Sequence, residues 1–277
     1  MRAASLLLVA GVVFALLAAP AGVFAQSQVT YTVPVNTTVP SVTYSLQGVY
    51  WLSSSEFYSA PGGGTLETWT SQLYGIDFRA DTRSHWGVHL NGVTGSEGNW
   101  TFAGAAPVGL SLSGTDTIWS ADVSYLVQRP LPENPLLPVT FRAFIGYGEA
   151  KGSLYSGNLS GLGRASLTAD STGPRVGFDF SYPFQSGWSL NAGAAYEPSV
   201  NTTISGSVGG SAQSATATGT GWDAQASARY TSAARWNVEV GYRFVQEIQS
   251  ALTLSGTAIC PCHTQWEGPL IAVGASF

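Results

Sequence analysis

Apolar side chains recur at every second position through much of this chain of 277 residues. One segment shows the pattern clearly. Its even-numbered positions are apolar, Val176, Phe178, Phe180, Tyr182 and Phe184, and its odd-numbered positions are polar or small, Arg175, Gly177, Asp179 and Ser181. A period of two places successive side chains on opposite faces of a strand. Because the same alternation returns at 119–127, 188–196, 222–230 and 236–244, the pattern predicts an all-β chain.

The segments with this period predict ten antiparallel strands, over 41–53, 65–80, 85–97, 115–129, 137–149, 171–184, 187–198, 220–231, 235–247 and 264–277. Strand ends inferred from a pattern are accurate to a few residues, so eight or twelve strands also fit. Brief turns at 81–84, 130–135, 185–187 and 232–234 alternate with long connections at 54–64, 98–114, 150–170, 199–219 and 248–263. Short turns at one end and long loops at the other are typical of a transmembrane up-and-down β-barrel.

Aromatic residues bound the apolar faces of the predicted strands, as in the pairs Trp188 and Tyr196, and Trp222 and Tyr230. Small aliphatic residues between interfacial aromatics indicate a band that faces lipid. Charged residues make up only 10% of the chain, against about 25% in an average soluble domain. The single lysine, Lys151, supports the same interpretation, because soluble surfaces usually carry many lysines.

A soluble secreted barrel with its apolar face inside is the alternative fold. It would have no reason to place Trp and Tyr at the strand ends, and its outer face would consist mostly of Gly, Ser, Asn and Ala. The pattern therefore favours the membrane barrel.

The first 25 residues have the layout of a secretory signal peptide. Arg2 precedes an apolar run from Leu6 to Leu17, and small residues lead to Ala25. The run is short for a membrane span, which needs about 20 apolar residues. We expect a signal peptide at 1–25, a periplasmic lead-in at 26–40 and the barrel at 41–277.

The last strand ends on an aromatic residue, and its apolar positions are Ile271, Val273, Ala275 and Phe277. This ending resembles the signal by which bacterial outer-membrane barrels are recognised for assembly. Together with the alternation, it makes residues 41–277 similar to small outer-membrane barrels of the OmpA, OmpX and opacity-protein kind. The resemblance implies a bacterial outer-membrane location, with membrane lipid and the barrel assembly machinery as partners, and implies little about activity.

The polar faces carry equal numbers of the two charges, Arg79, Arg142, Arg175, Arg229, Arg243 and Asp77, Asp122, Asp179, Asp223, Glu239. A tight turn after residue 231 predicts Asp223 opposite Arg243 and Arg229 diagonal to Glu239. Together with His89, these residues are candidates for lumenal ion pairs or for a pore lining. Paired charges could fill the lumen, or they could line a narrow pore that small solutes cross passively.

Candidate chemistry elsewhere is sparse. Asp77 and His89 are predicted to meet on one inward face, with His85 on the same face, but spacing places no Ser or Cys nucleophile beside them. Ten basic residues against sixteen acidic ones, with Arg2 removed, offer no nucleic-acid surface. We therefore expect no enzyme activity, no cofactor and no nucleic-acid partner.

Cys260 and Cys262 flank Pro261 in the last long connection, with His263 beside them. The two thiols could form a small disulfide in an oxidising location, belong to an ordinary loop tip, or bind a metal, for which only three ligands are present. The sequence as a whole favours a structural or surface-interacting barrel with a plugged or narrow lumen, and a passive channel is the alternative.

Overall fold

The computed structural model of the protein describes residues 42–59, 65–102, 112–128, 139–159, 163–185, 187–208, 211–250, 252–254, 257–260 and 262–277. The expected signal peptide and lead-in lie outside these residues, as does the predicted turn at 130–135, and they stay predictions. Among the described residues, no helix is long and apolar enough to cross a membrane.

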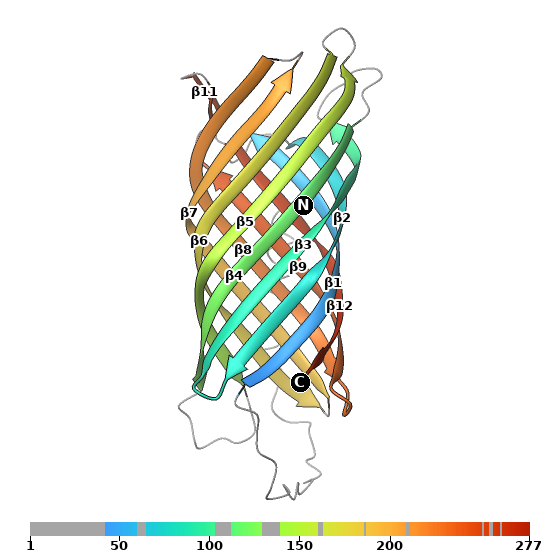
Figure 1. Ribbon diagram of the computed structural model, residues 1–277, viewed down its shortest axis with the longest axis vertical. Helices are drawn as coiled ribbons and strands as arrows, with labels where there is room; N and C mark the ends of the chain where they lie inside the picture. Colours follow the sequence, from blue (N-terminus) through green and yellow to red (C-terminus); the bar gives the residue numbers. More distant parts are fainter. Residues whose placement is uncertain are drawn as a thin grey trace, which may run out of the picture. The chain divides into compact units, whose positions relative to one another are not determined.

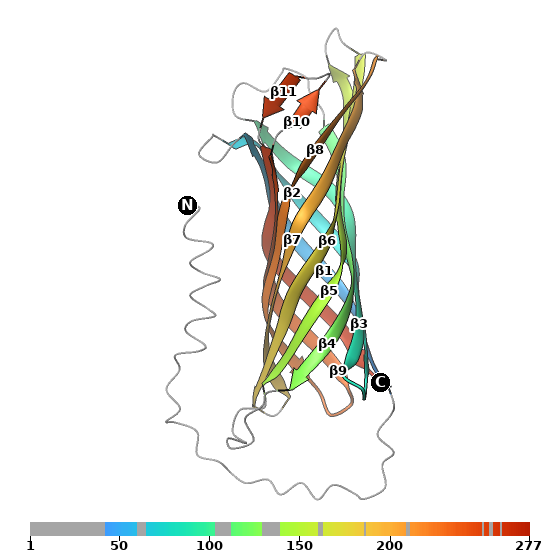
Figure 2. The ribbon, with the colours of Figure 1, turned by 90° about the vertical axis from the view of Figure 1, so that its left-hand side faces the viewer.

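Ten long strands form the barrel wall, and each overlaps one of the ten predicted segments. They are β1 (Val42–Ser59), β2 (Thr65–Thr82), β3 (Trp86–Phe102), β4 (Leu112–Gln128), β5 (Thr140–Leu159), β6 (Gly163–Gln185), β7 (Trp188–Val208), β8 (Ser211–Thr231), β9 (Trp236–Gln249) and β12 (Cys262–Ser276). Two short strands, β10 (Leu252–Leu254) and β11 (Thr257–Cys260), add a hairpin to β8 at the upper end of the barrel in Figure 2. The prediction of a ten-stranded antiparallel barrel is confirmed.

The sheet closes on itself. Strands β1 to β9 pair antiparallel in chain order, and β12 lies between β9 and β1 (Figure 1). The terminal residue takes part in this closure, because the backbone of Phe277 exchanges two hydrogen bonds with that of Tyr44, at 2.9 and 3.2 Å. In Figure 1 the C terminus lies at the same end of the barrel as the short turns.

The strands extend far beyond the predicted segments at the opposite end. Strands β5 to β8 have 20, 23, 21 and 21 residues, whereas about 9–11 tilted residues cross a bilayer. The long loops expected at 150–170 and 199–219 are therefore wrong in extent, since most of both ranges is strand. These ranges contain mostly Ser, Thr, Gly and Ala, so the two faces of the strand differ little in polarity and the alternation is weak. Backbone pairing between the strands nevertheless continues through them.

Two rings of outward-facing aromatic residues, which we call the lower and upper girdles, surround the outer face. The lower girdle, near the short turns, contains Tyr44, Trp86, Tyr125, Trp188, Tyr230 and Trp236. The upper girdle contains Tyr50, Tyr74, Trp119, Tyr147, Tyr196 and Trp222. Exposed aliphatic side chains such as Ile145 and Val240 lie between the girdles, as a lipid-facing band requires.

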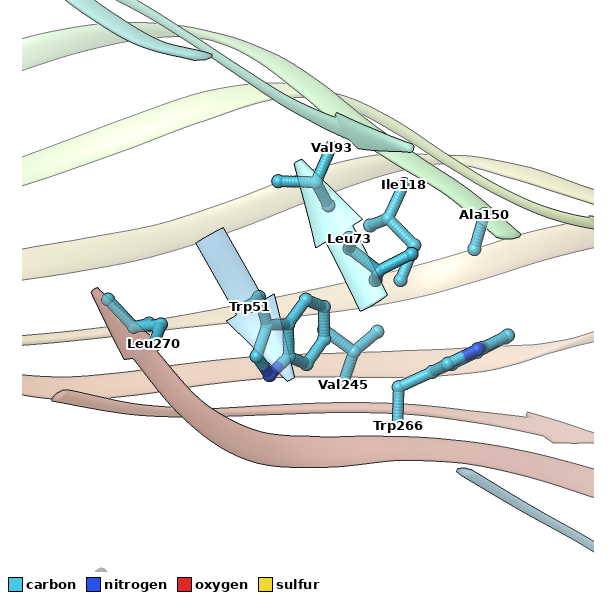
Figure 3. Packing of buried hydrophobic residues seen from close by; sticks show 8 residues of the cluster. All are labelled: Trp51, Leu73, Val93, Ile118, Ala150, Val245, Trp266 and Leu270. Atoms are coloured by element: carbon cyan, nitrogen blue, oxygen red, sulfur yellow. The ribbon is translucent and has the colours of Figure 1, made fainter. Parts of the chain in front are cut away.

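An apolar layer fills part of the barrel interior, which the alternation had predicted to be polar. It consists of Trp51, Leu73, Val93, Ile118, Ala150, Val245, Trp266 and Leu270, drawn from seven of the ten wall strands, β1 to β5, β9 and β12 (Figure 3). Trp51 and Leu73 have no exposed surface. These side chains lie between the charged part of the lumen near the short turns and the inward acids nearer the opposite end.

We expect Gly75→Ala to destabilise the barrel, because a Cβ at this inward position of β2 would lie 1.8 Å from the carbonyl oxygen of Gly92 on β3. The strands would have to separate locally, and overpacking of this kind costs about 1–3 kcal/mol. Gly48→Ala on β1 is the control, since its Cβ would meet nothing nearer than 3.8 Å. The temperature at which the refolded protein loses its heat-modifiable gel migration should fall for Gly75→Ala alone. Equal temperatures for the two variants would contradict this.

Candidate functional site

The candidate site is a network of ion pairs in the part of the lumen between the apolar layer and the short turns. It surrounds a cavity of about 150 Å³. The inward positions of eight strands, β1 to β6, β8 and β9, supply its members, because the pleat directs every second side chain inward. All eleven residues predicted to be lumenal lie within this network, and most of them line the cavity.

Asp223 on β8 binds two arginines. Its carboxylate accepts hydrogen bonds from Arg243 on β9, at 3.1 Å from Nε and 3.0 Å from Nη2, and from Arg175 Nη1 on β6, at 3.3 Å. The predicted pairing is confirmed, but its register is corrected by two residues. Asp223 lies opposite Val245, so it reaches Arg243 diagonally.

Arg229 and Glu239 form the second pair within the β8–β9 hairpin, with 2.6 Å between Nη2 and Oε2. The prediction placed them diagonally, whereas the structure places them directly opposite each other. The Ser227 hydroxyl donates to the same carboxylate. Gln47 on β1 extends the group, since its side chain accepts from Arg229 Nη2 at 3.4 Å and donates to Asn237 at 2.6 Å.

Two further ion pairs join strands that are not neighbours. Arg79 Nη2 on β2 lies 2.7 Å from Asp179 Oδ2 on β6, and Arg142 Nη2 on β5 lies 3.0 Å from Asp81 Oδ2 on β2. They connect opposite parts of the wall through the lumen. Sequence reasoning missed Asp81, although it continues the inward positions of Asp77 and Arg79 to the end of the strand.

His89 lies between two carboxylates. Its Nε2 is 2.7 Å from Asp77 Oδ2, and its Nδ1 is 3.8 Å from Asp122 Oδ2. The predicted contact between Asp77 and His89 is confirmed. The two residues are diagonal neighbours on adjacent strands. The prediction for His85 is wrong: it lies in the turn with a φ of 71°, and its ring contacts the outward-facing Tyr125 with ring centroids 6.0 Å apart.

Two arginines of the network also contact aromatic rings, one of which, that of Trp51, belongs to the apolar layer. The guanidinium carbon of Arg243 lies 5.2 Å from the centre of the Trp51 ring, and that of Arg175 lies 5.4 Å from the centre of the Phe144 ring. Cation–π contacts of this kind are favourable when water is excluded. Arg243 therefore links the charges to the apolar layer above them.

Other predicted residues lie outside this site. The side chains of Cys260 and Cys262 are outside the described part of the structure, so the disulfide stays a prediction. Ile271, Val273 and Phe277 are exposed on the outer face of β12 or just beyond its end, and their role in assembly also stays a prediction. Within the described ranges, no group of three or more His, Cys, Asp or Glu residues is placed to hold a metal ion.

A closed antiparallel barrel with a lipid-facing band, two aromatic girdles and a charged lumen defines an outer-membrane β-barrel. No protein-family model matches the sequence, and no curated protein sequence matches it. Solved structures do match, and the fold is similar to that of the outer membrane protease OmpT from Escherichia coli, with a TM-score of 0.58. The two sequences are 10% identical, and the match covers 88% of this chain and 98% of that one.

Two other similar structures are outer-membrane or attachment proteins. The attachment invasion locus protein Ail of Yersinia pestis gives a TM-score of 0.35 at 9% identity, covering 86% of this chain and all of Ail. A major outer membrane protein from Thermus thermophilus gives 0.38 at 13% identity, with the same coverage values. At these identities the similarity to solved structures shows the fold alone, which is that of an outer-membrane β-barrel.

A double-mutant cycle on Asp223 and Arg243, using alanine at both positions, should give a coupling energy of about 1–3 kcal/mol in urea unfolding. Both side chains are largely buried, at 11% and 6% exposed, so water screens their attraction weakly. The matched control is Lys151 and Asp170, which are 3.7 Å apart and 42% and 36% exposed. Their coupling should stay below about 1 kcal/mol. Equal couplings would show that burial does not strengthen the lumenal pair.

Proposed function

We propose that the protein is a non-conducting outer-membrane scaffold that presents its outer hairpins to the cell surroundings. The observation that carries this proposal is the filling of the lumen by two successive layers, the ion-pair network and the apolar layer. Either layer alone would obstruct a solute. Together they leave a cavity whose volume of about 150 Å³ holds a few water molecules.

The ion-pair network obstructs passage because its bonds cross the lumen. A solute or hydrated ion would have to displace Arg79 from Asp179 or Arg142 from Asp81. Separating partly buried charges leaves each of them without compensation, which costs several kcal/mol. The network therefore favours a closed lumen.

The apolar layer obstructs passage by a different mechanism. Trp51 and Leu73, both without exposed surface, fill the lumen just above the charges. Apolar constrictions exclude water and thereby block ions. This layer supports the proposal independently of the ion pairs.

We propose that the chain has no enzymatic role. OmpT is described as a protease, but the only acid and histidine pair predicted for this chain lies deep in the lumen. Both ring nitrogens of His89 face carboxylates, those of Asp77 and Asp122. Neither nitrogen is left to take a proton from a serine hydroxyl, as nucleophilic catalysis requires.

The outer ends of β5 to β8 are the proposed working surface. They continue about 12 residues beyond Tyr147 and Tyr196 of the upper girdle, which at about 3.3 Å per residue is some 40 Å of strand before tilt. Binding residues are often placed on segments that a rigid scaffold holds. Export by a cleaved signal peptide and insertion by the barrel assembly machinery belong to this proposal.

Planar-bilayer recording of the refolded mature chain tests the closed lumen. We expect no conductance steps from the wild type, and discrete steps from the variant that combines Trp51→Ala with Arg243→Ala, because it removes a residue from each layer. Ile76→Ala, a lipid-facing change, is the control and should stay silent. Steps from the wild type would overturn the proposal and favour a passive channel for small solutes.

A further inference from the structure

The part of the lumen beyond the apolar layer, toward the outer end, contains acids that face no arginine or lysine among the described residues. Its inward residues include Glu67 on β2, Glu97 on β3, Asp116 on β4 and Glu247 on β9. Among the described residues, no Arg or Lys side chain faces this part of the lumen, because the nearby Lys151 pairs with Asp170 on the outer face. This arrangement contrasts with the paired charges of the candidate site.

Glu97 and Asp116 form the centre of this group. Their positions on β3 and β4 are diagonal, since Glu97 lies opposite Gly114. A Cβ built at Gly152 on β5 would lie 3.4 Å from Asp116 Oδ1 and 3.9 Å from Glu97 Oε1, so the two carboxyl groups converge on one point. Glu97 Oε2 and Asp116 Oδ1 are buried without a hydrogen-bond partner. Two charged carboxylates at this place would therefore repel each other with little to compensate them. A proton on Glu97 removes this repulsion and lets the two side chains stay together.

The surroundings keep Asp116 in place. Asp116 has no exposed surface, and its Oδ2 accepts hydrogen bonds from Trp69 Nε1 at 3.1 Å and from Ser71 Oγ at 2.5 Å. Its Oδ1 has no hydrogen-bond partner and points toward Gly152 on β5, where a Cβ would lie 3.4 Å from it. Glu97 is only partly buried, so it is the member that can move.

We propose that the Glu97–Asp116 pair is a proton-operated switch in the outer half of the lumen, which holds the interior packing at acidic and neutral pH and releases it at alkaline pH. When the proton leaves Glu97, two adjacent negative charges repel each other. Asp116 is fixed by Trp69 and Ser71, so Glu97 turns toward water. No partner ligand and no conductance is required for this step.

The charged groups around Glu97 support this direction. Asp116 faces it from β4 and Glu67 from β2, while the inward β5 residues Ala150 and Gly152 carry no titratable group. Glu97 lies beyond the upper girdle, three residues past Thr94, which is opposite Tyr74. Burial, followed by the nearby charges of Asp116 and Glu67, raises the pKa of Glu97 from 4.5 to about 9.

The movement would be transmitted to a pair of stacked tryptophans. Trp69 and Trp100 lie with ring centroids 5.0 Å apart and an interplanar angle of 17°. Trp69 is bonded to Asp116, and Trp100 follows Glu97 on the same strand across an irregularity at Asn99, whose φ is 51°. Release of Glu97 should therefore disturb the stack.

Thermal and urea unfolding of the full refolded chain between pH 5 and 9.5 provide the first test. The folded state holds one more proton than the unfolded state between pH 4.5 and about 9, so stability falls as pH rises through this window. The folding equilibrium constant of the wild type should decrease by up to about tenfold per pH unit relative to that of Glu97→Gln. Glu56→Gln, a change remote from the pair, should keep the wild-type slope.

Near-ultraviolet circular dichroism of the stacked tryptophans provides the second test. The wild-type signal should change with a midpoint near pH 9, below the ionisation of ordinary tyrosines at about 10. Trp100→Phe should abolish the signal, Glu97→Gln should make it independent of pH, and Asp116→Asn should move the midpoint toward lower pH. The same slope and spectra for wild type and Glu97→Gln would overturn the switch without bearing on whether the lumen conducts.

Discussion

Closure of the sheet is the constraint on which the rest of the structure depends. Inside a bilayer there is no water to satisfy backbone N–H and C=O groups, so every strand needs a partner on both sides. The chain meets this need with β12, which lies between β1 and β9, and with the β8–β9 pairing. Phe277 completes the ladder through its bonds to Tyr44, so even the last residue contributes to closure.

Closing ten strands fixes the width of the lumen, and that width decides what must fill it. Alternation directs half of the side chains inward, and they have to reach one another or leave costly empty space and unpaired charge. Long arginine side chains solve this problem, since Arg79 and Arg142 extend across the lumen to acids on strands that are not their neighbours. The apolar layer fills the next height with Trp51, whose ring also contacts Arg243.

The period of two predicted the fold, the number of strands and the lumenal charges, because these follow from local alternation. It also predicted contacts within a hairpin, such as that of Asp223 with Arg243. The register of this hairpin was predicted two residues away from the observed one, because it depends on the exact position of the turn. The contact of Arg79 with Asp179 could not be predicted, since it depends on the diameter and stagger of the closed barrel. The apolar layer was missed because neighbouring apolar residues, as in Trp51-Leu52, hide which side chain faces inward.

The negative charge of buried acids is compensated differently in the two polar parts of the lumen. Near the short turns each acid has an arginine or histidine within reach, so the charges are retained and the wall is braced across the lumen. Toward the outer end no arginine or lysine of the described residues faces Glu97 and Asp116, and a proton has to take the place of the missing cation. Opposite charges hold the first part of the lumen together, whereas the packing of the second part depends on a proton. The barrel therefore combines a rigid base in the membrane with an outer half whose packing responds to its surroundings.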